Sequence, residues 1–178
     1  MKNNRFIHYA FVLGLIASIS AGILAVVNKE TISVIETNQM AVVNQSRKLV
    51  LTSAETFDTE KTVKVDGMEF IPGMDENGEI VGYVVTVSEP GYVTDIDFVL
   101  GIENKGVVSG LKIINSQETP GLGSKIMDEE WQKKAMGKDE TYTFNKSTDG
   151  FAGATISPNA VYSGIKKALT SFKNGVKK

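Results

Sequence analysis

The sequence contains no cysteine and a single histidine, His8. The lack of cysteine excludes disulfides, thiolate metal sites, iron–sulfur clusters and lipid attachment through cysteine. His8 lies beside a hydrophobic segment at the N-terminus. The rest of the chain therefore lacks a histidine that could bind a metal or activate a nucleophile. We therefore expect no metal ligands and no catalytic residues, and any redox chemistry must come from a bound cofactor.

Internal repeats and low-complexity tracts are also absent, and 42% of the 178 residues are hydrophobic. This composition fits one compact domain with an appendage. All 21 acidic residues and 17 of the 19 basic ones follow the N-terminal hydrophobic segment, so that part carries 17 − 21 = −4. Such mild acidity argues against nucleic acid as a partner.

The N-terminal region predicts a membrane anchor. No residue from Ala10 to Val27 is charged, and the apolar stretch of roughly 20 residues is long enough to cross a hydrocarbon core of ~30 Å. Lys2 and Arg5 precede it and the first acidic residue, Glu30, follows. The positive-inside rule then places the N-terminus in the cytoplasm and the main domain outside, with the anchor in contact with membrane lipid.

A cleaved signal peptide is the alternative, with Lys2 to Arg5 as its n-region and a cut after Ala21 or Ala25. The long apolar run and the lack of a clean A-x-A motif favour the retained anchor. Small residues at near-helical spacing could let a second membrane helix approach closely, although ordinary membrane-helix composition explains them equally well. They are Gly14, Ala17, Ser18, Ala21, Gly22 and Ala25.

After the anchor (1–28), residues 29–55 predict a helical stalk, because apolar residues recur at helical spacing and no glycine or proline interrupts them. The extracytoplasmic domain then covers 56–178. Segments rich in Val, Ile, Tyr and Phe predict hairpins and a mainly antiparallel sheet. The predicted strands are Lys61–Phe70, Glu79–Val87, Val93–Ile102 and Gly106–Asn115, with turn signals at 75–78, 89–91 and 103–106.

The second half of the domain predicts flanking helices, which makes the fold class α+β: one transmembrane helix followed by one domain. Ser157 at the N-cap and Pro158 at the first helical position are a strong helix start. The predicted elements are a loop at Gln117–Gly123, a helix at Asp128–Met136 with Trp131 and Met136 facing inward, a short strand at Thr141–Phe144 and a helix from Pro158 to about Phe172.

The segment Asp149–Ser157, DGFAGATIS, ends at this helix start. Glycine and alanine leave room for a bulky group to reach the hydroxyl of Thr155. A helix N-terminus offers unpaired N–H groups and the positive end of a dipole, which suit a phosphate. Glycine-rich loops before helices are usually simple turns, so both interpretations stay open for the segment alone.

The segment Glu118–Gly123, ETPGLG, predicts a type II turn with Gly121 at positive φ. Gly123 is the second residue of this loop without a side chain, so the loop could lie flat against a planar ligand with Leu122 as an apolar contact. A purely structural turn is again the alternative.

Taken together, ETPGLG and a downstream DGxxGAT behind one membrane helix resemble the G subunit of the Rnf electron-transport complex. They also resemble the homologous C subunit of the sodium-pumping NADH:quinone reductase, in the same FMN-binding domain family. The resemblance covers essentially the whole chain, including the Gly91-Tyr92 segment and the Trp131 helix, and the short length favours the Rnf subunit.

In that family a flavin transferase uses FAD to esterify the threonine of the GAT triplet to the phosphate of FMN. The resemblance therefore implies covalent FMN on Thr155. It implies a cofactor site made of Glu118, Thr119, Pro120, Gly121, Leu122, Gly123, Gly153, Ala154 and Ser157. The residues read by the transferase would be Asp149, Gly150, Gly153, Ala154 and Thr155.

The resemblance also implies an electron-carrying subunit of an ion-translocating ferredoxin:NAD oxidoreductase, with the other subunits as partners and no catalytic site of its own. The chain has no Rossmann fingerprint, so nicotinamide and ferredoxin would bind elsewhere in the complex. The alternatives are an FMN subunit of a quinone reductase or another extracytoplasmic reductase, and a non-redox membrane-anchored interaction protein.

Three residues leave details open. Glu118 could relay protons near the flavin, although a solvated loop carboxylate is the more common situation. Ala152 stands where the family often has Ser or Thr, and Ser116 stands where many Rnf members have His. Neither departure touches the threonine itself.

Overall fold

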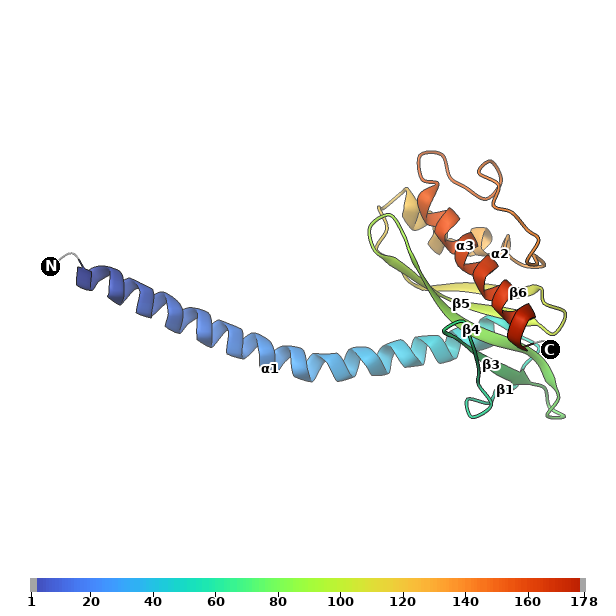
Figure 1. The fold of residues 1–178 in the computed structure, drawn as a ribbon, viewed down its shortest axis with the longest axis horizontal. Helices are drawn as coiled ribbons and strands as arrows, with labels where there is room; N and C mark the ends of the chain where they lie inside the picture. Colours follow the sequence, from blue (N-terminus) through green and yellow to red (C-terminus); the bar gives the residue numbers. More distant parts are fainter. Residues whose placement is uncertain (1–2, 177–178) are drawn as a thin grey trace. The chain divides into compact units, whose positions relative to one another are not determined.

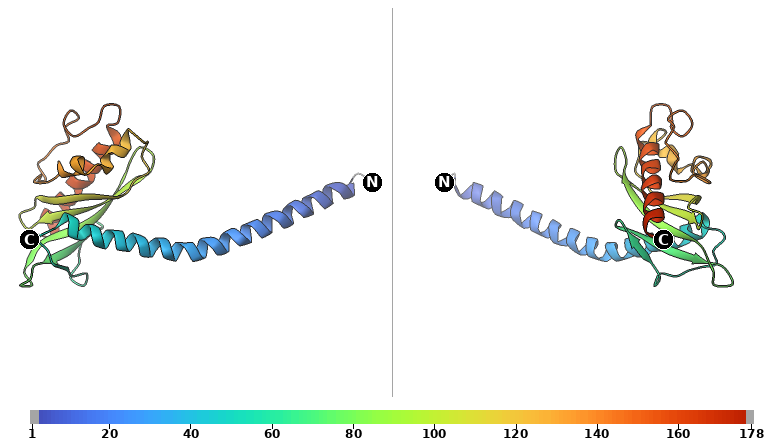
Figure 2. Two further views of the ribbon diagram at one scale, coloured as in Figure 1. Left: turned by 180° about the vertical axis from the view of Figure 1, so that it is seen from behind. Right: turned by 45° about the vertical axis from the view of Figure 1, so that its right-hand side comes forward.

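The computed structural model describes residues 3–176 and divides the chain into two compact units, Met1–Ala41 and Val42–Lys178. Helix α1, Asn3–Val50, is continuous and contributes to both units, as Figures 1 and 2 show. Within it, Arg5–Ile32 is long and apolar enough to cross a membrane by length and composition. The predicted anchor and stalk are thus one helix, which ends five residues before the predicted end of the stalk.

The second unit is built on an antiparallel sheet, as predicted, and belongs to the α+β class. The strand order is β1-β3-β4-β5-β6, and β2 pairs with β3. The strands are β1 Thr56–Phe57, β2 Val63–Val65, β3 Met68–Met74, β4 Ile80–Pro90, β5 Asp95–Glu103 and β6 Val108–Asn115. Two of the three predicted turns join consecutive strands where expected, with Gly78 and Gly106 at positive φ. The turn between β4 and β5 lies slightly later than predicted, at Gly91–Thr94.

The first predicted strand, Lys61–Phe70, is wrong as a single element. It consists of two strands, β2 and β3, joined by Asp66 and Gly67, which have φ values of 51° and 79°. Asp-Gly is the preferred pair for a two-residue hairpin turn in which both residues have positive φ. The short strand β1 was not predicted, because two residues carry too little periodicity to be recognised.

One face of the sheet is covered by α3, Ile156–Ser171, which continues into a π-helical turn, η2, Phe172–Val176 (Figure 1). The helix lies close to the sheet at Gly164, where an added Cβ would be 2.7 Å from Glu89 Cγ and 2.8 Å from Phe98 Cζ. The largest side chains of this core include Phe70, Phe98, Ile96, Leu100, Ile102, Ile113, Leu169 and Phe172.

The opposite face of the sheet is covered by the C-terminal end of α1 and the turn after it. Val50, Leu51 and Ala54 pack there against side chains of β3, β4 and β5. Gly101 and Gly110 are cross-strand partners on β5 and β6, and an added Cβ on either would lie within 2.7 Å of Val50 main-chain atoms. The hydroxyl of Ser109 donates to the Val50 carbonyl at 2.6 Å, which satisfies one of the free carbonyls at the helix end.

The region between β6 and α3 differs from the prediction at two points. Helix α2 is shorter than predicted and covers only Glu129–Lys133. Trp131 is buried as predicted, whereas Met136 lies beyond the end of the helix and is 54% exposed. The chain leaves the helix through turns that end at Gly137, with φ of 76°, which carries Met136 away from the core. Residues 141–144 form no strand, because this stretch lies in an extended loop whose backbone is held by Asp139 and Asp149.

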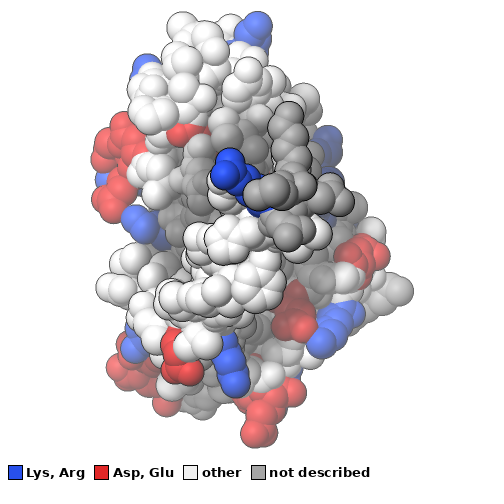
Figure 3. Space-filling model, turned by 90° about the vertical axis from the view of Figure 1, so that its left-hand side faces the viewer, with Lys and Arg blue, Asp and Glu red and all other residues white. Residues whose placement is uncertain are grey.

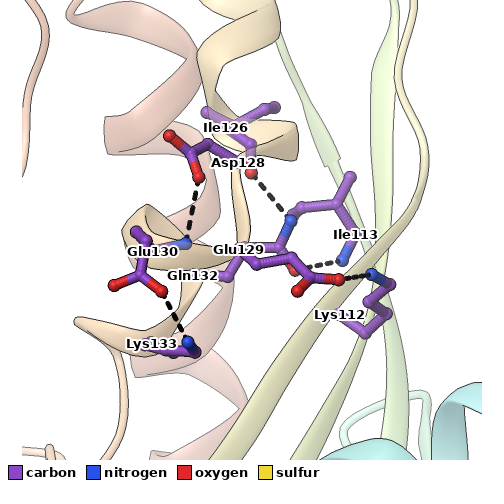
Figure 4. Close-up of polar contacts among 8 residues, drawn as sticks. All are labelled: Lys112, Ile113, Ile126, Asp128, Glu129, Glu130, Gln132 and Lys133. Carbon is purple, nitrogen blue, oxygen red and sulfur yellow. Dashed lines mark hydrogen bonds and ion pairs between the residues drawn. The ribbon is translucent and has the colours of Figure 1, made fainter.

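Helix α2 is held against the edge strand β6 by a buried glutamine (Figure 4). Gln132 donates from Nε2 to the Ile126 carbonyl at 3.1 Å and accepts the Ile113 N–H at 3.3 Å. Lys112 and Glu129 form an ion pair at 3.2 Å beside it. The 3₁₀ helix η1, Gly123–Met127, and the loop before it are thereby fixed to the sheet.

Charged side chains on the face drawn in Figure 3 are interspersed, with acidic and basic residues in several separate groups. In the part of the chain that is described there, no broad patch of one sign is seen. This agrees with the near balance of charges in the sequence, whose formal net charge is −2.

Candidate flavin site

Three segments that are distant in the sequence surround one pocket of about 260 Å³. They are the β4–β5 turn, the loop after β6 and the start of α3. The lining residues are Tyr92, Glu118, Thr119, Leu122, Gly123, Gly153, Ala154, Thr155, Ile156 and Ser157. The two sequence segments singled out for chemistry therefore meet at one place.

Two of the predicted cofactor residues, Pro120 and Gly121, do not line this pocket. They form the corner of a turn in which Leu122 N–H donates to the Thr119 carbonyl at 3.1 Å. Gly121 has φ of 74°, as a type II turn requires at that position. Pro120 and Gly121 therefore shape the loop: the turn that they form connects Thr119 and Leu122, which do line the pocket.

Glu118 connects all three walls. Its Oε1 accepts the N–H groups of Tyr92 at 2.9 Å and Val93 at 3.1 Å, and its Oε2 accepts the hydroxyl of Ser157 at 2.5 Å. The residue is only 5% exposed. The interpretation of Glu118 as a solvated loop carboxylate is therefore wrong, because both of its oxygens are buried acceptors.

The environment of Glu118 favours its charged form. Burial raises the pKa of this carboxyl, but the hydrogen bonds from Ser157, Val93 and Tyr92 outweigh burial and hold the pKa below its usual value. Two glycines make the room for it: an added Cβ would lie 2.4 Å from Oε1 at Gly91 and 2.7 Å from Oε2 at Gly123. An ionised carboxylate that is already bonded at both oxygens is suited to hold the walls together.

Thr155 is the N-cap residue of α3, which corrects the prediction that Ser157 has this role. The main chain of Thr155 has φ of −101° and ψ of −15°, and its hydroxyl makes no capping hydrogen bond. Ser157 lies inside the first turn, where its hydroxyl is taken by Glu118. Pro158 follows as the third helical residue. The hydroxyl of Thr155 is thus left available at a helix N-terminus.

The residues before Thr155 form a tight turn. Ala154 N–H donates to the Phe151 carbonyl at 3.1 Å, and Gly153 has φ of 79°. Ala152 and Gly153 are exposed, whereas Ala154 and Thr155 are partly buried. The three residues that precede Thr155 are thus small, and two of them are exposed.

Asp149, predicted to be read by the transferase, is 2% exposed. Burial raises the pKa of its carboxyl, but hydrogen bonds from Tyr142 and the Asn145 N–H, together with the charge of Lys138, lower the pKa below its usual value. Its carbonyl accepts the indole N–H of Trp131 at 2.7 Å. The start of the segment is therefore part of the domain interior.

Two pocket residues had no independent signal in the sequence. Tyr92 is part of the segment that carries the family resemblance, and Ile156 lies in the DGFAGATIS segment without a predicted role; both line the pocket, with 68% and 52% of their surfaces exposed. Of the two departures from the family pattern, Ala152 is exposed. The hydroxyl of Ser116 is buried and has no hydrogen-bond partner among the described residues.

The chain is similar to known FMN-binding proteins and to subunits of ion-translocating oxidoreductase complexes. Residues 91–170 match the FMN-binding domain family. The chain is 30% identical to the G subunit of the Na⁺-translocating ferredoxin:NAD⁺ oxidoreductase complex of Acetobacterium woodii, over 92% of this chain and 89% of that protein. It is 29% identical to the G subunit of the ion-translocating oxidoreductase complex of Shewanella oneidensis, over 96% and 91%.

Among solved structures, the crystal structure of Shewanella oneidensis NqrC shares the fold. Its TM-score is 0.50 at 17% sequence identity, over 68% of this chain and 69% of that one. The matched FMN-binding region contains every wall of the pocket, from the β4–β5 turn to the start of α3. The chain therefore belongs to the family of G subunits of ion-translocating oxidoreductase complexes, and it carries an FMN-binding domain.

Proposed function

We propose that this chain carries electrons in an Rnf-type complex by means of FMN bound covalently, through its phosphate, to Thr155. The observation that carries the proposal is the position of the Thr155 hydroxyl: it lies at the N-terminus of α3, makes no capping bond and belongs to a residue that lines the pocket. A hydroxyl in that position can accept a phosphate ester without the loss of a capping hydrogen bond.

The surroundings of Thr155 fit a phosphate. The N–H groups in the first turn of a helix have no intrahelical acceptor, and the helix dipole adds a partial positive charge at this end. Helix α3 has 16 residues, which is long enough for this effect. The Glu118 carboxylate accepts three hydrogen bonds, from the N–H groups of Tyr92 and Val93 and from the hydroxyl of Ser157, and these donors partly offset its negative charge. A phosphodiester at Thr155 would therefore be stabilised mainly by the helix start.

The remaining walls fit a planar, largely apolar ring system. Tyr92, Leu122 and Ile156 line the pocket from three segments, and each keeps more than two fifths of its surface exposed. Flavin rings are bound by apolar and aromatic contacts of this kind, with a few polar groups that fix orientation. We propose that these side chains cover the ring only in part, which would leave an edge open for electron transfer.

FMN, when bound, would supply one- and two-electron redox chemistry. The chain itself would retain the cofactor and fix its position. Attachment requires a separate flavin transferase and FAD: the Thr155 oxygen bonds to the flavin-side phosphorus, the pyrophosphate bond breaks, AMP leaves, and the hydroxyl proton passes to a base of the transferase. Glu118 is poorly suited to be that base, since its hydrogen bonds from Ser157, Val93 and Tyr92 lower the pKa of its carboxyl and so weaken it as a base.

The partners follow from the relatives, which are named as subunits of ion-translocating oxidoreductase complexes. We propose that α1 anchors the chain in the membrane beside the other subunits, with the N-terminus in the cytoplasm and the FMN-binding domain outside. Lys2 and Arg5 before the apolar stretch support this orientation. Ferredoxin and nicotinamide would then be bound by other subunits.

The test is to express the full chain with its flavin transferase, denature it, and measure flavin fluorescence on a gel together with intact mass. Wild type is compared with Thr155→Val, which keeps a β-branched side chain and removes the hydroxyl. We expect denaturation-resistant fluorescence and an FMN-sized mass increase in wild type alone. Unmodified wild type, under conditions that label a known acceptor, would favour a non-redox interaction protein. Covalent flavin without co-purifying complex subunits would favour a carrier for another reductase.

A further inference from the structure

We propose that the negative charge of Glu118 lowers the reduction potential of the FMN that this pocket holds. A lower potential makes the reduced cofactor a stronger electron donor to the next carrier. The inference rests on the proposed attachment of FMN at Thr155. It goes beyond that attachment, because it names a residue that controls how readily the bound flavin gives up its electrons.

Glu118 is the charged residue of the pocket. Ten of the described residues line the pocket, and Glu118 is the one among them that carries a charge at neutral pH. Because the residue is buried, water and salt screen its charge less than they screen the charge of a surface carboxylate. The pocket wall therefore presents a negative charge to whatever the pocket binds.

Neutral donors alone offset this charge. The carboxylate of Glu118 accepts hydrogen bonds from the N–H groups of Tyr92 and Val93 and from the hydroxyl of Ser157. Within the described part of the chain, it forms no ion pair with a lysine or an arginine. Hydrogen bonds from neutral groups favour the ionised form of a carboxyl but bring no positive charge with them. The wall therefore stays negative overall.

A second buried carboxylate in the same region is neutralised by a cation. Glu89, near the end of β4, is 6% exposed, and both of its oxygens accept hydrogen bonds from Nζ of Lys167 at 2.7 Å. Glu89 does not line the pocket. The chain thus pairs the buried carboxylate outside the pocket with a lysine and leaves the one in the pocket wall without a cation. This contrast supports an electrostatic role for Glu118 toward the pocket.

Reduction of FMN makes the ring system more negative. The oxidised ring is neutral, and when it takes up two electrons from a donor and one proton from water, it gains one negative charge. A carboxylate in the pocket wall repels that charge and so disfavours the reduced form relative to the oxidised form. A nearby like charge changes a charging equilibrium by about tenfold or more. For a two-electron couple, a tenfold change is about 30 mV.

The test is a redox titration of the full chain in detergent, after the flavin transferase has loaded it with FMN. The midpoint potential is measured by flavin absorbance against a reference dye, at mildly alkaline pH, where one proton accompanies the two electrons. We expect Glu118→Gln to raise the midpoint potential by about 30 mV or more, which is at least a tenfold change in the equilibrium constant of reduction.

Glu89→Gln is the matched control, because it removes a buried carboxylate that lies outside the pocket. This variant should change the potential little.

Ser157→Ala separates the charge of Glu118 from its role in joining the walls. This variant keeps the charge and removes a donor that partly offsets it, so the potential should fall. A loosened pocket would instead admit water in both Ser157→Ala and Glu118→Gln. Water stabilises a negative reduced ring, so loosening alone would raise the potential in both variants. Opposite shifts therefore identify the effect of the charge.

Two results would overturn the proposal. One is an unchanged or lower potential in Glu118→Gln, and the other is a potential in Ser157→Ala that is not lower than that of wild type. If Glu118→Gln does not fold, the second criterion decides alone. A wild-type chain that shows no flavin fluorescence after denaturation contradicts the proposed function itself, and the present inference falls with it.

Discussion

The carboxylate of Glu118 and the hydroxyl of Ser157 meet at 2.5 Å although 39 residues separate them in the sequence. This hydrogen bond joins the loop after β6 to the first turn of α3. The other oxygen of Glu118 holds the β4–β5 turn through the N–H groups of Tyr92 and Val93. One buried side chain thus joins the three segments that form the walls of the pocket.

Replacement of Glu118 by Gln should weaken the domain and the pocket together. The amide keeps the shape of the side chain, but one acceptor oxygen becomes a donor that faces a hydroxyl or two N–H groups. We expect a loss of roughly 1–3 kcal/mol in the free energy of unfolding, measured by urea denaturation of the domain in wild type and variant. Glu76→Gln, in the exposed β3–β4 turn, is the control and should change little. Equal losses in the two variants would refute the role of Glu118.

The same carboxylates predict how stability depends on pH. The folded-state pKa values of Glu118 and Asp149 are lowered, so the unfolded chain binds protons first as the pH falls. The stabilisation is fully present above the unfolded pKa values of about 4 and is lost as the pH falls through the lower folded values. Urea midpoints from pH 7 to pH 3 should fall more steeply in wild type than in Glu118→Gln. If the urea midpoints of wild type and Glu118→Gln fell in parallel with pH, the lowered pKa of Glu118 in the folded state would be contradicted.

Local sequence patterns were sufficient for the main strands and for α3. The long strands alternate and are separated by glycine turns that need positive φ, such as Gly78 and Gly106, so their positions follow from short-range rules. The Asp66-Gly67 hairpin was missed because apolar residues flank it closely, and the stretch resembles one continuous strand. The folded chain shows a hairpin, because Val65 pairs with Met68 and Asp66 and Gly67 both have positive φ.

The site was predictable in its parts but not in its assembly. The segments around Leu122 and Thr155 were identified from motifs, yet nothing local indicates that Ser157 bonds to Glu118 rather than capping the helix. The same holds for Tyr92, which lines the pocket and whose N–H donates to Glu118 across 26 residues of sequence. Long-range hydrogen bonds of this kind depend on the folded arrangement, which one sequence does not reveal.

Two tyrosines beside Asp149, Tyr162 buried and Tyr142 partly buried, should respond differently to loss of the hydroxyl. The buried hydroxyl of Tyr162 interacts with the Asp149 carboxylate but makes no hydrogen bond of good geometry among the described residues, so Tyr162→Phe should cost less than Tyr142→Phe. The hydroxyl of Tyr142 donates to the ionised Asp149 at 2.6 Å, so Tyr142→Phe should cost about 1.5–3 kcal/mol. Urea unfolding of the two variants side by side provides the check, and each serves as the control for the other. A greater cost for Tyr162→Phe would be inconsistent with this hydrogen-bond assignment.

The packing of the end of α1 on the sheet predicts that a single methyl group added to the sheet there lowers the stability of the domain. An alanine Cβ at Gly101 would lie 2.2 Å from the Val50 carbonyl oxygen and 2.4 Å from the Ser109 hydroxyl. The main chain would have to move, and the Ser109–Val50 hydrogen bond would be strained. We expect Gly101→Ala to destabilise the domain by about 1–3 kcal/mol or more.

Gly22→Ala is the matched control, because an added Cβ there meets nothing within 4 Å and alanine favours a helix. Both variants are compared with wild type as full chains in detergent, by urea unfolding followed by Trp131 emission. Molecules of Gly101→Ala that remain folded should still take up flavin on Thr155, since the residues that line the pocket are separate from the cluster at the end of α1. Unchanged stability in Gly101→Ala would mean that the end of α1 does not pack on the sheet as closely as described.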